Sequence, residues 1–206
     1  MQLYDIHTHR TDSENAIINR NLTPSNTRPC SVGIHPWEIA DNSMELLHKL
    51  KEVAESKNVV AIGECGFDFI KGTATKKIQQ EIFAAHIALS EELNKPLIIH
   101  SVKAETELLG TARQYKHKQA WIVHGFRGKP QQAANLLKAG MYLSYGEHFN
   151  HESLRNTPPG RLFIESDESN LYITEIYNKI SKVLGISCDL LVQQIAANIR
   201  SCNIKL

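Results

Sequence analysis

The chain has 206 residues, 42% of them hydrophobic and 22% charged, so it can build a sizeable core, and we expect one domain over residues 1–206. Its 23 basic and 22 acidic residues give a net charge of +1, which excludes a strong global attraction to nucleic acid or anionic lipid. The four cysteines form no C-x-x-C pair, and the sequence contains neither a secretory signal pattern nor an apolar run long enough to span a bilayer. We therefore expect a cytoplasmic protein with reduced thiols and no membrane partner.

Short apolar segments predict eight strands in chain order. The first ends in Asp5-Ile6-His7-Thr8-His9, and the fourth opens with a continuous β-branched run that is typical of a strand buried on both faces. The expected strands are residues 3–9, 16–19, 30–35, 59–64, 97–100, 120–124, 141–145 and 162–167.

Apolar residues at helical spacing predict six helices between and after these strands. The longest is stopped by Pro96, and Asn42 with Glu45 forms the pattern of a capping box at the start of the first. The expected helices are residues 43–56, 75–94, 104–115, 130–139, 172–184 and 188–199.

Strands that alternate with helices predict a parallel sheet with helices outside it. Eight strands of this kind indicate an α/β fold of the TIM-type (β/α) barrel class, which typically needs ~250 residues. The shortage falls in the first third of the chain, where the connections between strands are too short for full helices. We therefore expect a trimmed and slightly open barrel.

Barrel enzymes place their catalytic residues at the carboxyl ends of the strands. Side chains alternate faces along a strand, so His7 and His9 point the same way, and two imidazoles on one face suit a metal such as zinc or manganese. Taken alone, this pair has two readings, a metal site or two chance histidines. The later strands also end in ligand-type residues, namely His35, Glu64, His100, His124 and Asp167. Even with His35 set aside, the set is large enough for two divalent metals with one bridging carboxylate.

Six blocks of the sequence resemble, in order, the signature blocks of TatD-family metal-dependent hydrolases. They are Asp5-Ile-His7-Thr-His9, Gly33-Ile-His35-Pro36, Gly63-Glu64-Cys-Gly66-Phe-Asp68, Ile99-His100-Ser101, His124-Gly-Phe-Arg-Gly128 and Glu165-Ser-Asp167. The family consists of amidohydrolase-like TIM barrels, most of them divalent-metal deoxyribonucleases, many acting from the 3′ end. The resemblance implies a metal-dependent hydrolase of ester bonds, most simply a phosphodiesterase or deoxyribonuclease with a metal-activated water.

The resemblance also implies a binuclear site for two divalent ions, which would be Zn, Mn or Mg. His7 and His9 would hold the first ion with Asp167, and Glu64 would bridge both ions. The second ion would be completed by His100 and His124.

Asp167 and Glu64 are the implied catalytic residues, and Asp167 would accept the proton of the attacking water. His35 and Arg127 are expected to contact the substrate phosphate. Alternatively, His35 could contact the metal-binding side chains without binding a metal itself. Glu165 and Asp68 are candidates for orienting a ligand histidine, and Asp68 could also cap a turn. The remaining histidines are expected to be structural or exposed, and they are His48, His86, His117, His148 and His151.

The sequence departs from the family in loops that shape the substrate groove. His100 is followed by Ser101-Val102-Lys103 where the family usually has arginine and an acidic residue, and the proline- and arginine-rich loop expected after Asp167 is missing. The expected partner is therefore DNA or a small phosphoester. A hydrolase of a small ester or amide, and a metal-binding module without catalysis, are the alternatives. The oligomeric state is left open, with a monomer as one expectation.

Overall fold

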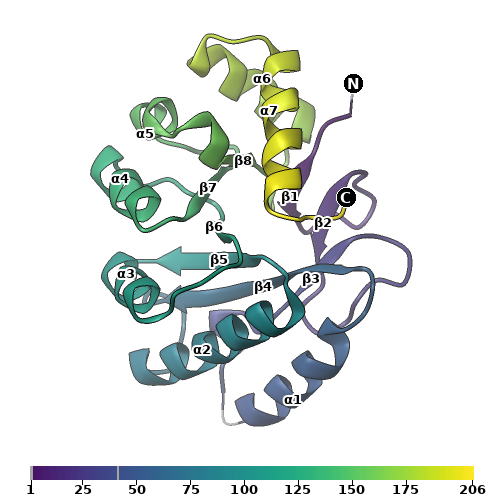
Figure 1. Cartoon of the computed structure of the whole chain (residues 1–206), viewed down its shortest axis with the longest axis vertical. Coiled ribbons are helices and arrows are strands. Elements are labelled where there is room, and N and C mark those ends of the chain that lie inside the picture. Colours follow the sequence, from purple (N-terminus) through teal and green to yellow (C-terminus); the bar gives the residue numbers. More distant parts are fainter. Residues whose placement is uncertain (1, 41) are drawn as a thin grey trace.

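The structure is a computed structural model that describes residues 2–40 and 42–206. Eight parallel strands form one sheet in the order of the sequence, as expected for a TIM-type barrel (Figure 1). The strands are β1 (Asp5–Thr8), β2 (Ala16–Asn19), β3 (Cys30–Val32), β4 (Val59–Asp68), β5 (Leu97–Val102), β6 (Trp121–Val123), β7 (Tyr142–Tyr145) and β8 (Leu162–Ile164).

A narrow seam between β8 and β1 nearly closes the barrel. An isolated parallel bridge joins Thr8 to Asp167, where the Asp167 backbone N–H donates to the carbonyl of His7 at 3.0 Å. Below this bridge, the buried Asp5 carboxylate accepts hydrogen bonds from the backbone N–H and the hydroxyl of Ser166, at 3.0 and 2.5 Å. Two residues that are expected to bind metal, His7 and Asp167, are therefore positioned by the seam itself.

Helices cover the sheet except outside its first strands. They are α1 (Ser43–Ala54), α2 (Lys76–Leu93), α3 (Glu105–Gln114), α4 (Pro130–Lys138), α5 (His151–Asn156), α6 (Ile173–Leu184) and α7 (Cys188–Ser201), with 3-10 turns η1 (Pro36–Glu38) and η2 (Pro159–Arg161). No helix separates β1 from β2 or β2 from β3 in this fully described stretch, and only loops lie outside these purple strands in Figure 1. The prediction of a barrel trimmed in its first third is confirmed.

Several element boundaries differ from the prediction for local reasons. The expected strand 30–35 ends at Val32, because Pro36 begins a 3-10 turn. The expected strand 59–64 continues to Asp68, because its pairing with β5 extends from Cys65 to that residue. Helix α5 was not predicted, although the Asn150 side chain caps it by accepting two backbone N–H bonds.

The predicted capping box at the start of α1 is wrong. Asn42 makes no side-chain cap hydrogen bond to any part of the chain that the structure describes. The hydroxyl of Ser43 instead donates to the Ala40 carbonyl at 2.6 Å and accepts the Ala40 N–H at 3.0 Å.

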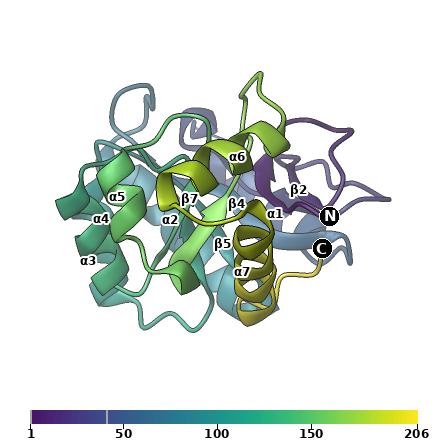
Figure 2. The same cartoon turned by 90° about the horizontal axis from the view of Figure 1, so that it is seen from above.

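The two ends of the barrel are distinct surfaces. In Figure 2 the loops after β4 and β8 rise at the upper edge, and the end of α7 lies at the opposite edge. Among the described residues, no single helix is long and apolar enough to span a membrane, although α6 and α7, bent by 104° relative to each other, meet the length and composition test as a pair.

Candidate metal centre

Seven of the eight predicted site residues converge at the carboxyl ends of the strands. They come from β1, β4 and β5 and from the first three residues after β1, β3, β6 and β8, and are His7, His9, His35, Glu64, His100, His124 and Asp167. Arg127, the eighth, lies on the exposed rim of the adjoining cavity. We call the seven converging residues the cage.

Glu64 lies at the centre of the cage, and its two oxygens face two different groups of donors. Its Oε1 is 2.8 Å from His100 Nδ1, 2.8 Å from His124 Nε2 and 3.1 Å from His35 Nε2. Because these three histidines all face Oε1, the other oxygen of Glu64 is free to face a second group of donors.

The second oxygen of Glu64 faces the seam. Its Oε2 is 3.4 Å from His7 Nε2 and 3.8 Å from His9 Nε2, and Asp167 Oδ1 lies 3.7 and 3.6 Å from the same two nitrogens. The Asn19 amide donates to this Oε2 at 3.0 Å and fixes its orientation. The geometry therefore offers two neighbouring ligand groups that share one carboxylate.

Charge in the cage is balanced between Glu64 and His124. Burial by itself would raise the pKa of Glu64, but His124 and hydrogen bonds from three histidines hold it well below its usual value. Burial would lower the pKa of His124, but Glu64 and Glu165 raise it well above its usual value. A divalent cation bound here would replace the His124 proton, because metal binding and protonation compete for the same nitrogen.

Carboxylates on the outer sides of His100 and His124 suit metal ligation by their inner nitrogens. Asp68 Oδ2 lies 3.1 Å from His100 Nε2, so with an ion in the cage this nitrogen would hold the ring proton, and Nδ1, which faces Glu64 Oε1 at 2.8 Å, would be the ligand atom. Glu165 Oε1 lies 3.5 Å from His124 Nδ1, which leaves His124 Nε2 as the inward nitrogen.

His7 provides an independent test of whether the cage fits a metal. Both of its ring nitrogens are buried, and neither has a hydrogen-bond partner among the described residues. An unpartnered buried nitrogen is costly, and a metal ion would satisfy His7 Nε2. The residues present therefore fit a divalent ion.

The tautomer of His35 is fixed by a backbone N–H. The backbone N–H of Trp37 donates to His35 Nδ1 at 3.1 Å, so the proton lies on Nε2. By distance alone His35 belongs to a ligand group with Glu64 and His100, but its inward nitrogen is a hydrogen-bond donor. This orientation suits contact with an anionic oxygen better than contact with a cation.

Asp68 both orients a ligand histidine and caps a turn. Besides facing His100, it accepts the Trp37 indole N–H at 2.7 Å and the backbone N–H groups of Ile70 and Lys71 at 2.8 Å. Burial would raise the pKa of Asp68, but these hydrogen bonds lower it to about 2, so the carboxylate stays ionised.

Sequence reasoning missed Asn19 and Trp37. Asn19 is the last residue of β2, so the rule that strand ends carry the site could have found it. Trp37 lies in a 3-10 turn that the sequence did not predict, and its indole is 46% exposed at the mouth of the barrel.

Two cavities flank the cage, and Trp37 lines both. The larger, of about 740 Å³, runs over the ends of β5 and β6, and the basic residues Lys71, Lys103 and Arg127 line it. The smaller, of about 210 Å³, opens over the cage itself and is lined by all of its residues except His7. An extended substrate could therefore continue away from the cage on the side that carries the cations.

The other histidines are structural or exposed, as expected. His86 is buried in α2, where its Nε2 accepts the Ile34 N–H at 2.9 Å and its Nδ1 donates to the Ile82 carbonyl at 2.8 Å. His117 stacks on Trp121, and His48, His148 and His151 are exposed.

Comparisons with known proteins agree with this geometry. The TatD related DNase family model matches residues 6–203. An uncharacterized metal-dependent hydrolase of Buchnera aphidicola is 35% identical over 149 residues, which are 68% of this chain and 56% of that protein. A protein of Pantoea ananatis named 3'-5' ssDNA/RNA exonuclease TatD is 32% identical over 112 residues, which are 54% of this chain and 43% of that protein.

The chain thus spans about half the length of these curated relatives. The crystal structure of YJJV, a TatD homolog from Escherichia coli, superposes with a TM-score of 0.82 over 98% of both chains at 18% identity, which shows the shared fold. With a family match over nearly its whole length, the chain belongs to the TatD-related DNase family.

Proposed function

We propose that this chain is a divalent-metal-dependent phosphodiesterase that hydrolyses nucleic-acid phosphodiester bonds. The observation that carries the proposal is the shared carboxylate of Glu64, which faces two groups of histidines with inward nitrogens. The name of the Pantoea ananatis relative, an exonuclease of single-stranded DNA and RNA, supports the same class of substrate.

In the proposed site, His7, His9 and Asp167 would hold a first ion, His100 and His124 would hold a second, and Glu64 would serve both. Zn, Mn and Mg are the candidate ions, and two bound ions would supply an acidified water and a clamp for the phosphate oxygens. Asp167, whose side chain is 25% exposed, accepts the proton of the attacking water.

His35 and Arg127 are the proposed phosphate contacts. His35 presents a fixed Nε2–H toward the cage, and Arg127 lies on the rim of the larger cavity. Lys71 and Lys103 line the same cavity, so a nucleic-acid strand that leaves the cage on this side meets positive charge at its next phosphates. Residues 1–206 would act as one domain, and the cytoplasm stays the predicted compartment.

The decisive experiment measures turnover of chelator-treated protein after reloading with Mg²⁺, Mn²⁺ or Zn²⁺. The substrates are 3′-labelled single-stranded DNA, single-stranded RNA, a small phosphodiester, a phosphomonoester and an amide. We expect cleavage of the phosphodiesters, and a loss of about a hundredfold or more in Asp167→Asn and Glu64→Gln. Metal content should be two ions per chain in the unmutated protein.

Asp189→Asn, which removes an exposed carboxylate on α7, is the matched control and should cleave normally. Cleavage of the amide or monoester without cleavage of any phosphodiester would replace the proposal with a small-molecule hydrolase. Full metal loading without turnover of any substrate would favour a metal-binding module.

A further inference from the structure

The end of the barrel opposite the cage carries an unbalanced set of positive charges. Four segments at this end, residues 113–118, 138–142, 155–161 and 200–205, contain eight lysines and arginines and no aspartate or glutamate. The first three precede β6, β7 and β8, so they lie at the amino ends of strands whose carboxyl ends face the cage. We call these four segments the basic face.

The segments of the basic face form one continuous surface. Gly140 lies beside the His117 imidazole, and the Arg161 guanidinium donates to the Gly140 carbonyl at 2.8 Å. The amide of Asn198 near the end of α7 donates to the Pro159 carbonyl at 2.7 Å, which joins the C-terminal segment to the others.

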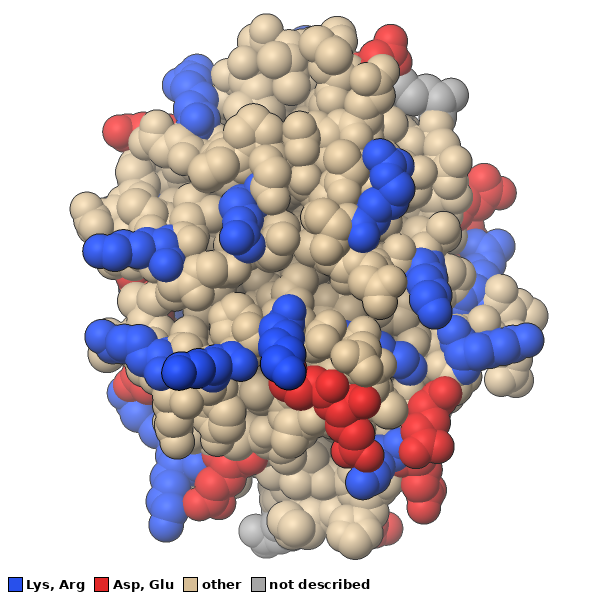
Figure 3. Space-filling model, in the orientation of Figure 1, with Lys and Arg blue, Asp and Glu red and all other residues tan. Residues whose placement is uncertain are grey.

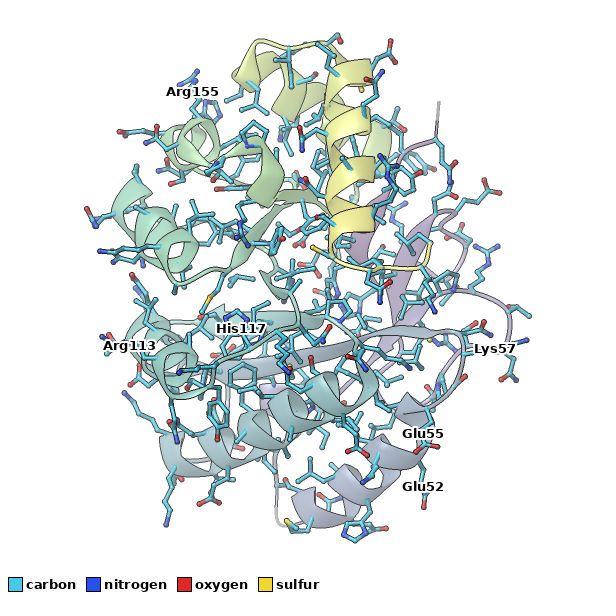
Figure 4. The ribbon with its side chains drawn as sticks, viewed as in Figure 1. Glu52, Glu55, Lys57, Arg113, His117 and Arg155 are labelled. Atoms are coloured by element: carbon cyan, nitrogen blue, oxygen red, sulfur yellow. The ribbon has the colours of Figure 1, made fainter. Side chains whose placement is uncertain are left out.

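The figures show how these charges are distributed. Figure 3 shows blue side chains spread over the surface, with red ones gathered at its lower part and rim. In Figure 4, Arg113, His117 and Arg155 lie on the left and upper left, and Glu52 and Glu55 of the α1 end mark the acidic border at lower right.

The lysine and arginine side chains of the basic face have no carboxylate partner among the described residues. The Glu91 carboxylate lies beside the face, but it accepts the backbone N–H groups of Lys118 and Gln119, at 2.8 and 3.0 Å. None of the eight cations lies within 4.0 Å of a carboxylate oxygen of residues 2–40 or 42–206, whereas Lys51, Lys76 and Lys77 each have such a partner. Favourable contact with helix dipoles explains cations in the last turns of α3, α4, α5 and α7. It does not explain Lys116, Lys118 and Lys205, which lie outside helices.

The chemistry of the basic face favours a chain of phosphates over a protein or a lipid bilayer. All of the large exposed hydrophobic side chains of the described residues lie outside the four segments, so the face has no apolar anchor for a protein core or an acyl layer. Its aromatic rings already have partners, because Arg161 covers Tyr142 at 4.5 Å, His117 stacks on Trp121 at 4.4 Å and the partly buried Tyr115 packs against the hydrophobic core. Contacts would therefore be made to the backbone rather than to bases.

We infer that the basic face is a second nucleic-acid-binding surface, separate from the metal centre, that holds the sugar-phosphate backbone without regard to sequence. Because it needs no base stacking, it accepts duplex as well as single strands. The inference goes beyond the proposed hydrolysis and stands without it.

The test measures binding of a short fluorescein-labelled DNA duplex to the full chain by fluorescence anisotropy, in chelator, over a series of salt concentrations. Lys116→Glu/Lys118→Glu is the test variant, and Lys49→Glu/Lys77→Glu is the control with the same net charge and exposed positions on other surfaces. We expect the test variant to weaken binding about tenfold and to reduce the slope of log Kd against log salt by about 0.9 for each lost phosphate contact. The control should bind like the unmutated chain.

A second variant, Arg200→Glu/Lys205→Glu, tests a different segment of the same face and should also weaken binding. Equal weakening in the control, or unchanged binding in both test variants, would overturn the inference. So would competition by polyglutamate, or by phosphatidylserine vesicles, as strong as that by unlabelled duplex. Turnover of a small phosphodiester should be unchanged in all three variants, so failure of the basic face and failure of the proposed hydrolysis are seen separately.

Discussion

At the scale of single residues, neighbouring groups decide what each histidine of the cage can do. The outer nitrogens of His100 and His124 face carboxylates, which would leave their inner nitrogens for a metal ion, whereas His35 accepts a backbone N–H and presents an inward proton. The same side chain is thus suited to a cation at two positions and to an anion at the third.

Asp68→Asn should weaken binding of the second metal. The carboxylate that orients His100 would be replaced by a neutral amide, and loss of such an outer partner typically costs about 10–100-fold in metal affinity. The measurement is a titration of chelator-treated protein with Co²⁺, followed by absorption. Asp189→Asn is the control, and an unchanged affinity of Asp68→Asn would contradict the role of Asp68.

Trp37→Ala should impair long substrates more than short ones. The exposed indole lines both cavities and is held by its N–H bond to Asp68, so it forms a rigid platform. The flexible Lys71 side chain lies over its ring at 4.3 Å, and a base that stacks on Trp37 would displace it. Stacking of this kind contributes ~1–3 kcal/mol, so KM for oligonucleotides should rise roughly tenfold.

Trp37→Phe is the matched control, since it also loses the indole N–H but keeps a ring, and its KM for oligonucleotides should stay close to normal. The KM of a small phosphodiester should change little in either variant. An equal rise for both substrates in Trp37→Ala would mean that Trp37 acts only through Asp68.

At the scale of elements, the seam between β1 and β8 is the weakest part of the barrel and carries part of its site. β8 pairs with β7 over three residue pairs but meets β1 through a single bridge. Side-chain bonds from Ser166 to Asp5 and to Thr8, at 2.5 and 2.8 Å, supplement that bridge.

Ser166→Ala should therefore lower both stability and affinity for the first metal. Removing the hydroxyl leaves a buried Asp5 oxygen unsatisfied, which costs about 1–3 kcal/mol. The measurements are urea unfolding in chelator and metal titration. Ser201→Ala removes a hydroxyl at the end of α7 that donates to the Asn198 carbonyl at 2.8 Å, and should change neither quantity. A stable variant with normal metal affinity would show that the backbone bridge suffices.

At the scale of the whole molecule, the buried His86 makes the free energy of unfolding depend on pH. Burial lowers the pKa of His86 to about 4, and its Nε2 already accepts the Ile34 N–H, so a proton there would oppose a donor. In the unfolded chain the pKa of His86 would be about 6.5, so the unfolded state takes up a proton at a higher pH than the folded state. The stability that His86 contributes is therefore complete above about pH 6.5 and is lost as the pH falls toward 4.

We expect the free energy of unfolding to fall by about 3 kcal/mol from this group between pH 7 and pH 4. His86→Gln keeps an acceptor for Ile34 but does not titrate, so its loss of stability over the same range should be smaller by that amount. The free energy of unfolding of both proteins is measured with urea, in chelator, at several pH values. Both proteins contain the histidines of the cage, so the difference between their pH profiles reports on His86. Identical pH profiles would remove His86 from the account.

The barrel class and most of the cage could be predicted from the sequence because both follow from short-range rules. Apolar runs and their spacing set the strands, and ligand-type residues at six strand ends marked one end of a parallel barrel. Three features were missed because local sequence signals are weak in short elements. Asn19 ends a four-residue strand, Trp37 lies in a 3-10 turn, and helix α5 has only six residues.

The sequence by itself therefore determined which donors meet, since strand order and side-chain parity place them on one rim. Only the tertiary structure decided how each donor is used, because a histidine tautomer depends on partners such as Trp37, Asp68 and Glu165 that arrive from other loops and strands. The basic face likewise exists only after folding, because its four segments are separated in the sequence. They form one charged surface only where the fold brings the ends of helices and the starts of strands together.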